Sequence, residues 1–390
     1  MKTNVKYSIG LDIGQKEFHA CVSVIDSLQK VTVKGSRKFG NSAVGFADFS
    51  EWLEKHLKEA LPRVYVMEAT GVYYENLCYF LYDKGFSVSV IVPSLSKKYA
   101  QSLGIHTKTD KVDSQILARL GAERCLSEWK PFTPSMSKLR KMTRQPENLQ
   151  GIRSQLNNQL HAQESGHDRE EMIENQLISL LSEIDKQLAE MAQGIKSLIE
   201  NDAKLNRKWK QVEPILGVGM LSFATIVAET NGFVLFSNQR QLTKYAGYDV
   251  IENQSGKHSG KTRISKKGNS RIRRILHMPA LWAVRAEDSI FAHLYNRIFE
   301  KTKIKMKGYT AVQRKLLTTI FHLWKQDEVY DIAHYKKTSE MHEPKTFFPL
   351  PQGETKANDK TESAPTCVEA ERDRPPHKLV AESLLSVGQR

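Results

Sequence analysis

The stretch Tyr7-Ser-Ile-Gly-Leu-Asp-Ile-Gly14 decides the fold, because it is an apolar, strand-like run with a single carboxylate inside it. A second apolar run, Val64-Tyr-Val-Met-Glu68, ends on another acid. A carboxylate inside or at the tip of a buried strand is costly unless something offsets its charge, and a divalent cation is the usual partner. Asp12 and Glu68 are therefore candidate metal ligands.

Two further acids lie in Lys108-Thr-Asp-Lys-Val-Asp113, where a spacing of three residues puts Asp110 and Asp113 on one face of a predicted helix. Each acid taken alone is more often a solvated charge or a helix cap. Acids from two strands and one helix can nevertheless converge on one point, where they suit two Mg²⁺ ions on either side of a reacting phosphate. The four acids in this order favour such a site, with Mg²⁺, or Mn²⁺ in its place, as the cofactor.

Strand-like and helix-like runs alternate through residues 1–125. The predicted strands cover residues 7–13, 17–24, 30–39, 64–67 and 87–92. Predicted helices run from a cap at Asn41 or Ser42 to about Lys58, from Tyr74 to Lys84, from Pro93 onward, and from Asp110 to about Arg124. Three strands followed by alternating helices and strands is the ribonuclease-H-like order, so this α/β domain is predicted to have a ribonuclease-H-like fold.

Residues 126–206 are predicted to form a helical coiled-coil arm. Apolar residues recur there every three or four positions from Leu177 to Leu198. Pro146 and the pair Ser165-Gly166 are expected to interrupt the first part of the arm, which gives two or more helices. An arm for dimerisation or for spanning nucleic acid and an intramolecular helical hairpin fit this pattern about equally well.

Residues 207–336 are predicted to form a mainly helical domain, and residues 337–390 a disordered tail. The motif Ile215-Leu-Gly-Val-Gly219 resembles the turn of a helix-hairpin-helix, whose backbone amides approach a phosphate. A lone Gly-x-Gly is more often only a tight turn. The tail is rich in Pro, Glu, Thr and Lys and poor in large apolar residues, as disordered segments are.

Bulk composition indicates a polyanionic partner and no membrane. The formal net charge is +14, and the four cysteines show no paired spacing, which fits a reducing cytoplasm and argues against disulfides or a zinc knuckle. We find no signal peptide and no apolar run of membrane-spanning length, so a soluble cytoplasmic protein is expected.

The positive charge is concentrated in the segment from Gln254 to Arg274, which holds eight Lys and Arg and no acid. Glycine there allows close passage of a sugar-phosphate backbone, and the cations neutralise it. The predicted nucleic-acid contacts are Lys257, Lys261, Arg263, Lys266, Lys267, Arg271, Arg273 and Arg274. Composition alone favours a loop that binds nucleic acid and does no chemistry. Ser255, Ser259 and Ser265 are candidate nucleophiles, but serine is inert unless it is activated.

These motifs resemble DEDD transposases of the one-hundred-ten family of bacterial insertion sequences, and the Piv-type DNA invertases share the pattern. The first domain is matched by Gly-Leu-Asp12-Ile-Gly, Met-Glu68-Ala-Thr-Gly and Lys-Thr-Asp110-Lys-Val-Asp113. The transposase domain is matched by Ile215-Leu-Gly-Val-Gly, Tyr245-Ala-Gly-Tyr, Gln254-Ser-Gly and Lys266-Lys-Gly-Asn-Ser-Arg. The motifs occur in the family's order over roughly residues 5–290, whereas the tail has no recognisable counterpart.

The resemblance implies a site-specific DNA recombinase in which the RuvC-like acids act with a serine of the second domain. By its place in Gln-Ser-Gly, that serine is Ser255. The resemblance also implies a structured bridge RNA that specifies donor and target DNA, a homodimer or homotetramer for strand exchange, and a bacterial, nucleoid-associated location. Two alternatives are a non-catalytic nucleic-acid-binding protein and an actin-like sugar kinase or ATPase. The kinase is disfavoured, because the sequence has no second Gly-rich phosphate loop.

Overall fold

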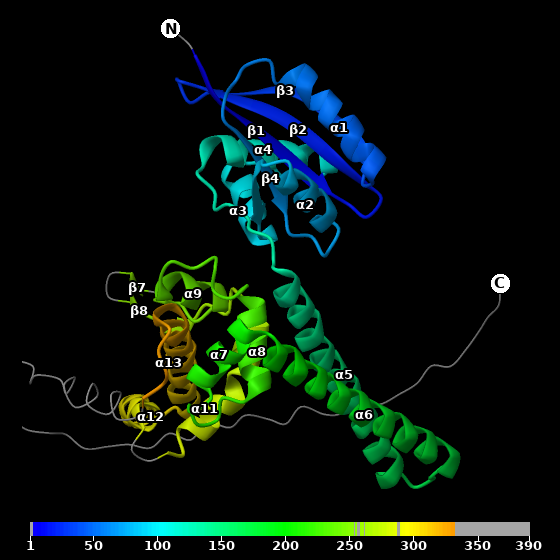
Figure 1. Cartoon of the computed structure of the whole chain (residues 1–390), viewed down its shortest axis with the longest axis vertical. Helices are drawn as coiled ribbons and strands as arrows, with labels where there is room; N and C mark the ends of the chain where they lie inside the picture. Colours follow the sequence, from blue (N-terminus) through cyan, green and yellow to red (C-terminus); the bar gives the residue numbers. More distant parts are fainter. Residues whose placement is uncertain (1–2, 253, 256–257, 261, 287–288, 332–390) are drawn as a thin grey trace, which may run out of the picture. The chain divides into compact units, whose positions relative to one another are not determined.

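The first five strands form one mixed sheet. The computed structural model describes residues 3–331, apart from 253, 256–257, 261 and 287–288. The strands are β1 (Asn4–Ile13), β2 (Glu17–Asp26), β3 (Val31–Gly40), β4 (Arg63–Glu68) and β5 (Ser87–Ile91). β1, β2 and β3 pair antiparallel, whereas β4 runs parallel to β1 and β5 parallel to β4, in the order β3-β2-β1-β4-β5 (Figure 1). This arrangement confirms the α/β fold predicted for the N-terminal domain.

Four helices cover the two faces of this sheet. They are α1 (Ala43–His56), α2 (Glu75–Asp83), α3 (Pro93–Ser102) and α4 (Asp110–Glu123). Side chains of α1 and α2 share an apolar core with Tyr65 and Met67 of β4, whereas α3 and α4 share another with Val66. Successive side chains of a strand point to opposite faces, so the two helix pairs lie on opposite sides of the sheet.

Helix α4 lies directly on the backbone of β1. A Cβ atom at Gly10 would lie 2.1 Å from the carbonyl oxygen of Ser114 and 2.2 Å from the backbone nitrogen of Ala118. Only glycine allows this approach, because any side chain would push the helix away from the strand. The contact holds the first turn of α4, which begins after the N-cap Thr109, close to the end of β1.

Two long helices follow the sheet domain and pack side by side as α5 (Pro134–Ser165) and α6 (Glu171–Asn201). The chain thus adopts the intramolecular hairpin, and a coiled-coil role in dimerisation stays a prediction. Gly166 ends α5 as expected, but the expected break at Pro146 is wrong, because this proline is buried inside the continuous helix. An interior proline loses one backbone hydrogen bond and its ring clashes with the preceding turn, and the burial of Pro146 offsets part of this cost.

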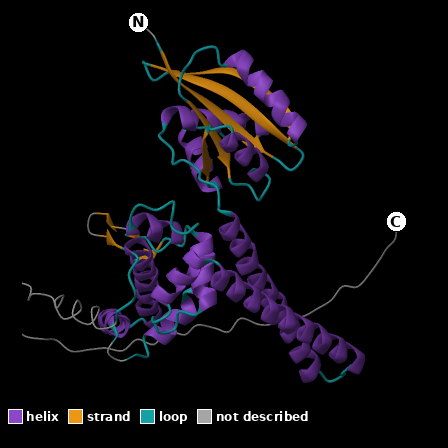
Figure 2. Ribbon diagram, viewed as in Figure 1, coloured by secondary structure: helices purple, strands orange, loops and turns teal. Residues whose placement is uncertain are grey.

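The remaining chain is mainly helical, as Figure 2 shows, and matches the predicted class. Its helices are α7 (Ala203–Val212), α8 (Met220–Glu229), α9 (Gln239–Ala246), α10 (Ser270–Ile275), α11 (His277–Ala283), α12 (Ile290–Thr302) and α13 (Lys305–Gln326). They share one apolar core with the near ends of α5 and α6, represented by Leu139 and Ile199. Four two-residue strands lie between α9 and α10: β6 (Val250–Ile251), β7 (Gln254–Ser255), β8 (His258–Ser259) and β9 (Arg263–Ile264).

The glycine-rich turn between α7 and α8 is packed against the protein. Gly217 has a φ of +88°, and a Cβ atom on it would lie 2.7 Å from Cβ of Trp282 in α11. Glycine is therefore needed both for the left-handed backbone and for contact with α11. A phosphate contact at Gly219 stays a prediction. None of the helices in the described part of the chain combines the length and apolar content needed to cross a membrane, and the predicted disordered tail, residues 337–390, lies outside that part.

The close contact at Gly10 predicts a large effect of a small substitution. Gly10→Ala should lower the free energy of unfolding by about 2 kcal/mol or more, because the methyl group meets backbone atoms that cannot rotate away. Gly151→Ala is the matched control, since nothing lies within 4 Å of its Cβ position in α5, and it should raise stability by about 0.5–1 kcal/mol. Urea denaturation followed by circular dichroism measures both. Equal stability of Gly10→Ala and the wild type would contradict a fixed contact between α4 and β1.

Candidate functional site

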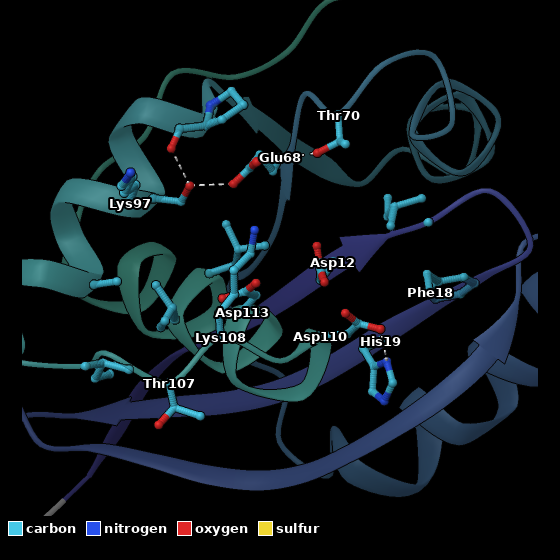
Figure 3. A pocket seen from close by; sticks show the side chains of 18 of the residues that line it. Asp12, Phe18, His19, Glu68, Thr70, Lys97, Thr107, Lys108, Asp110 and Asp113 are labelled. Carbon is cyan, nitrogen blue, oxygen red and sulfur yellow. Dashed lines mark hydrogen bonds and ion pairs between the residues drawn. The ribbon is translucent and has the colours of Figure 1, made fainter. Parts of the chain in front are cut away.

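The four predicted acids line one cleft of the sheet domain, with a volume of about 780 Å³. Asp12 lies near the end of β1, and Glu68 is the last residue of the neighbouring parallel strand β4. Asp110 and Asp113 lie in the first turn of α4. Figure 3 shows the four side chains facing the same space. The structure thus brings together residues that are about one hundred positions apart in sequence.

The cleft surrounds Asp12 with other acidic side chains and so disfavours its ionised form. Burial raises the pKa of Asp12 to about 6, and repulsion from Asp113, Asp110 and Glu68 adds to the effect, while Lys108 opposes it. Burial also raises the pKa of Asp113, against the attraction of Lys108 and together with repulsion from Glu68 and Asp110. These carboxylates destabilise one another when all are ionised, and a bound cation would remove that penalty.

The donor set fits a hard divalent cation. Carboxylate oxygens are the ligands that Mg²⁺ prefers, and four of them around a cleft suit one or two such ions. Among the described residues, no three His, Cys, Asp or Glu side chains are gathered closely enough to enclose an ion.

Two uncharged side chains orient Glu68. Ser96 in α3 donates a short hydrogen bond from Oγ to Oε2 of Glu68, and Thr70 donates from Oγ1 to Oε1 at 3.4 Å. Ser96 Oγ also lies 2.9 Å from the carbonyl oxygen of Pro93. Sequence reasoning missed Ser96, because it lies 28 residues after Glu68 and nothing in the pattern of α3 indicates contact with the cleft.

His19 is a further cleft residue that the sequence analysis missed. It lies directly across from Asp12 in the β1–β2 pairing, and its Nδ1 is 3.8 Å from Oδ2 of Asp110. The signal was present, since the short turn after Gly14 sets the register of two antiparallel strands. Lys97 and Lys108 also line the cleft and bring positive charge to its edge.

Ser255 lies outside the sheet domain, on the small β7–β8 hairpin. It is exposed, and it pairs with His258 in the backbone register of that hairpin. Ser265 is engaged differently, because its Oγ donates a short hydrogen bond to Oδ1 of Asp249 and accepts one from the backbone nitrogen of Lys267 at 3.2 Å. These bonds give Ser265 a role in closing the loop. The side chain of Ser259 is outside the described part.

The predicted nucleic-acid contacts divide into three groups. Arg263, Lys266 and Lys267 are exposed, and the predicted contacts Lys257 and Lys261 lie outside the described residues. The three arginines Arg271, Arg273 and Arg274 all have partners within the protein: Arg271 and Arg274 form ion pairs with Glu147 in α5, and Arg273 donates to the carbonyl oxygen of Ala246 at 2.7 Å. They therefore hold α10 in place and offer less free charge than their sequence pattern indicates.

A buried acid, Glu229 in α8, joins the arm to the end of the basic loop. Arg144 in α5 donates to it through Nε at 2.7 Å and through a terminal nitrogen at 3.0 Å. Asn269, the N-cap of α10, donates to Oε2 of Glu229 at 2.8 Å, and its backbone nitrogen donates to the carbonyl oxygen of Tyr245 at 2.7 Å. The loop that carries Ser255 is thus anchored at both of its ends.

An α/β sheet domain of ribonuclease-H-like order with four acids at one cleft defines a class of enzymes that cut phosphodiester bonds. Residues 9–163 match the model of the DEDD transposases of the IS110 type, and residues 210–296 match the model of the transposase IS116/IS110/IS902 family. The chain belongs to this family and is a DNA transposase or recombinase. The alternative of a sugar kinase or ATPase is therefore wrong.

Two curated relatives extend over nearly the whole chain. The pilin gene-inverting proteins of Moraxella bovis and Moraxella lacunata are each 28% identical over 327 residues, covering 84% of this chain and 98% of theirs. Among solved structures, one similar structure is Thermus thermophilus RuvC in complex with a Holliday junction substrate. The match covers 30% of this chain and 93% of the RuvC chain, with 11% identity and a TM-score of 0.24.

The raised pKa of Asp12 predicts a pH-dependent stability. Its folded pKa of about 6 exceeds the ordinary value of 3.8, so ionisation costs the folded state nothing below about pH 4 and its full penalty above about pH 6. Asp12→Asn cannot ionise. In EDTA the free energy of unfolding of this variant should therefore rise by about 1–2 kcal/mol relative to the wild type between pH 4 and pH 7, which is less than the full shift because solvent partly screens Asp12. Urea denaturation at both pH values measures this gain, and parallel stabilities of the two proteins would contradict it.

Proposed function

We propose that the chain is an RNA-guided, site-specific DNA recombinase that uses Ser255 as its nucleophile and a Mg²⁺ site made by Asp12, Glu68, Asp110 and Asp113. The observation that carries the proposal is the convergence of these four acids on one cleft, where burial raises the pKa of Asp12 and repulsion from the other three acids adds to the rise. Acids that destabilise one another in this way are expected where a cation is to be bound.

The names of the relatives support a reaction that both cuts and rejoins DNA. A pilin gene-inverting protein inverts a segment, as its name states, and inversion requires that every broken strand be joined again. Hydrolysis alone would release ends that need a separate energy source for joining. A covalent link between enzyme and DNA keeps the energy of the broken phosphodiester bond, which supports a nucleophilic side chain.

The exposed hydroxyl of Ser255 suits that nucleophile. In the proposed step, its Oγ forms a bond to phosphorus while the bond from phosphorus to one deoxyribose oxygen breaks, and the serine proton passes to that leaving oxygen. Rejoining is the reverse, with a deoxyribose hydroxyl from another strand attacking the phosphoserine. Ser265 is a poorer candidate, since its hydroxyl is already donated to Asp249.

The acidic cleft holds and orients the reacting phosphate in this proposal. Mg²⁺ bound there would supply electrophilic stabilisation of the phosphate and the leaving oxygen. Ser96 keeps the Glu68 carboxylate turned toward the cleft, and Lys97 and Lys108 attract the phosphate to its edge. The serine and the acids belong to different domains, so they must meet when DNA is bound. Exchange between two duplexes also needs several active centres, which supports a homodimer or homotetramer.

The covalent mechanism predicts a trapped protein–DNA adduct whose linkage maps to Ser255. Ser255→Ala should lose the adduct and retain DNA binding, because the loop keeps its charge. Ser265→Ala is the matched control from the same loop and should still form the adduct.

Asp113→Ala, or excess EDTA, should abolish strand cleavage in the otherwise intact protein. Denaturing gel electrophoresis and peptide mapping read out these results. An adduct that survives in Ser255→Ala would show that another residue is the nucleophile.

RNA guidance predicts that the protein purified under nuclease protection carries one discrete structured RNA. The affinity of the protein for this RNA should fall steeply as the salt concentration rises, because binding of the basic loop releases counterions from the RNA phosphates. Sequencing of the bound RNA and a recombination assay with and without it provide the measurement. Recombination between defined sites at full rate without any RNA would instead indicate an invertase that recognises DNA directly.

A further inference from the structure

The helical hairpin made by α12 and α13 carries charge of almost one sign. From Ser289 to Gln326 the sequence contains eight Lys and Arg, and the only acid is Glu300. Five of these cations cluster around the connection between the two helices and are exposed: Arg297, Lys301, Lys303, Lys305 and Lys307. This hairpin is separate in sequence from the basic loop at 254–274, and it contains none of the proposed catalytic residues.

These five side chains are not neutralised by their neighbours. Within residues 3–331, as far as the structure describes them, none of the five forms an ion pair, whereas Arg153 and Arg169 elsewhere on the surface have carboxylate partners. The first turn of α13 contains Lys305 and Lys307 and no acid. Cations are unfavourable at that end of a helix, and a merely solvated surface usually alternates the two signs of charge. An anionic partner would relieve the repulsion among these like charges, and their combined field would attract it.

Aromatic packing holds the hairpin in one shape. The rings of Tyr295 and Phe299 stack with centroids 5.9 Å apart, and Tyr309 of α13 lies 4.6 Å from Tyr295. Gly308 lets the helices approach, since a Cβ atom there would lie 2.6 Å from Cδ2 of Tyr295. The ammonium group of Lys303 lies 5.9 Å from the centre of the Phe299 ring. The cations therefore project from a rigid support, which reduces the entropy lost when they bind a ligand.

We propose that the α12–α13 hairpin is a second nucleic-acid surface, which grips a phosphate backbone independently of the loop that carries Ser255. Arg297 and Lys301 are one turn apart on one face of α12, and the lysines that follow extend the positive charge around the connection into α13. Lysine contacts phosphate as a point charge and reads no base edge. The hairpin thus provides a hold that does not depend on sequence. This inference rests on the proposed function and adds a binding surface to it.

The test uses the full chain with Lys301→Gln, Lys303→Gln, Lys305→Gln and Lys307→Gln combined. Glutamine keeps helix propensity close to that of lysine, and circular dichroism verifies folding. If the combined variant does not fold, the pairs 301/303 and 305/307 are compared separately. Fluorescence anisotropy measures binding to a random-sequence DNA duplex and to a structured RNA over a series of KCl concentrations. We expect the plot of log affinity against log salt to become shallower in the variant, with the magnitude of its slope reduced by about 2 to 4. The variant should also bind at least roughly tenfold more weakly than the wild type.

The matched control neutralises four exposed lysines of the sheet domain, Lys30, Lys34, Lys55 and Lys58, and should change binding much less. A loss confined to the duplex assigns DNA to the hairpin, a loss confined to RNA assigns the RNA, and a loss of both assigns the shared phosphate backbone. Unchanged slopes for both ligands, or an equal loss in the control, would overturn the inference alone. A wild-type protein that binds neither ligand would instead overturn the proposed function.

Discussion

The direct contact between α4 and the backbone of β1 at Gly10 is the constraint on which the acidic site depends. Because no side chain separates helix from strand, the first turn of α4 is carried to the end of β1, where Asp110 and Asp113 face Asp12. The parallel pairing of β1 with β4 brings Glu68 to the same edge. The apolar cores on both sides of the sheet stabilise an arrangement that the repulsion of four carboxylates opposes.

In the C-terminal part, the basic loop at 254–274 is rich in Lys, Gly and Ser and therefore has few apolar side chains with which to form a core. It is anchored through polar contacts to helices that already belong to the apolar core. Glu229 links Arg144 of α5 to Asn269 at the start of α10, and Tyr248 at the beginning of the loop donates from its hydroxyl to Gln313 of α13 at 2.9 Å. A buried carboxylate is tolerated there because charge-assisted hydrogen bonds surround it.

Local patterns predicted the sheet domain well, because alternation, caps and Gly–Pro signals act over a few residues. The Ser42 cap, the helix opening at Pro93 and the acids of α4 are examples. The failures are long-range. Pro146 looked like a helix break because its burial against other helices is invisible in sequence. The partners of Glu229, 85 residues from Arg144 and 40 from Asn269, follow from packing alone. His19 was within reach, because strand register could have placed it opposite Asp12.

Glu147 has a consequence for how this protein searches for its site. The carboxylate of Glu147 forms ion pairs with both Arg271 and Arg274 and so lowers the positive electrostatic potential at the surface of α10. Sequence-independent attraction speeds the first encounter with nucleic acid but also prolongs each stay at a wrong position. If α10 contacts nucleic acid as proposed, an acid on the neighbouring helix weakens sequence-independent binding there, and replacing Glu147 is expected to lengthen the residence time on random sequence.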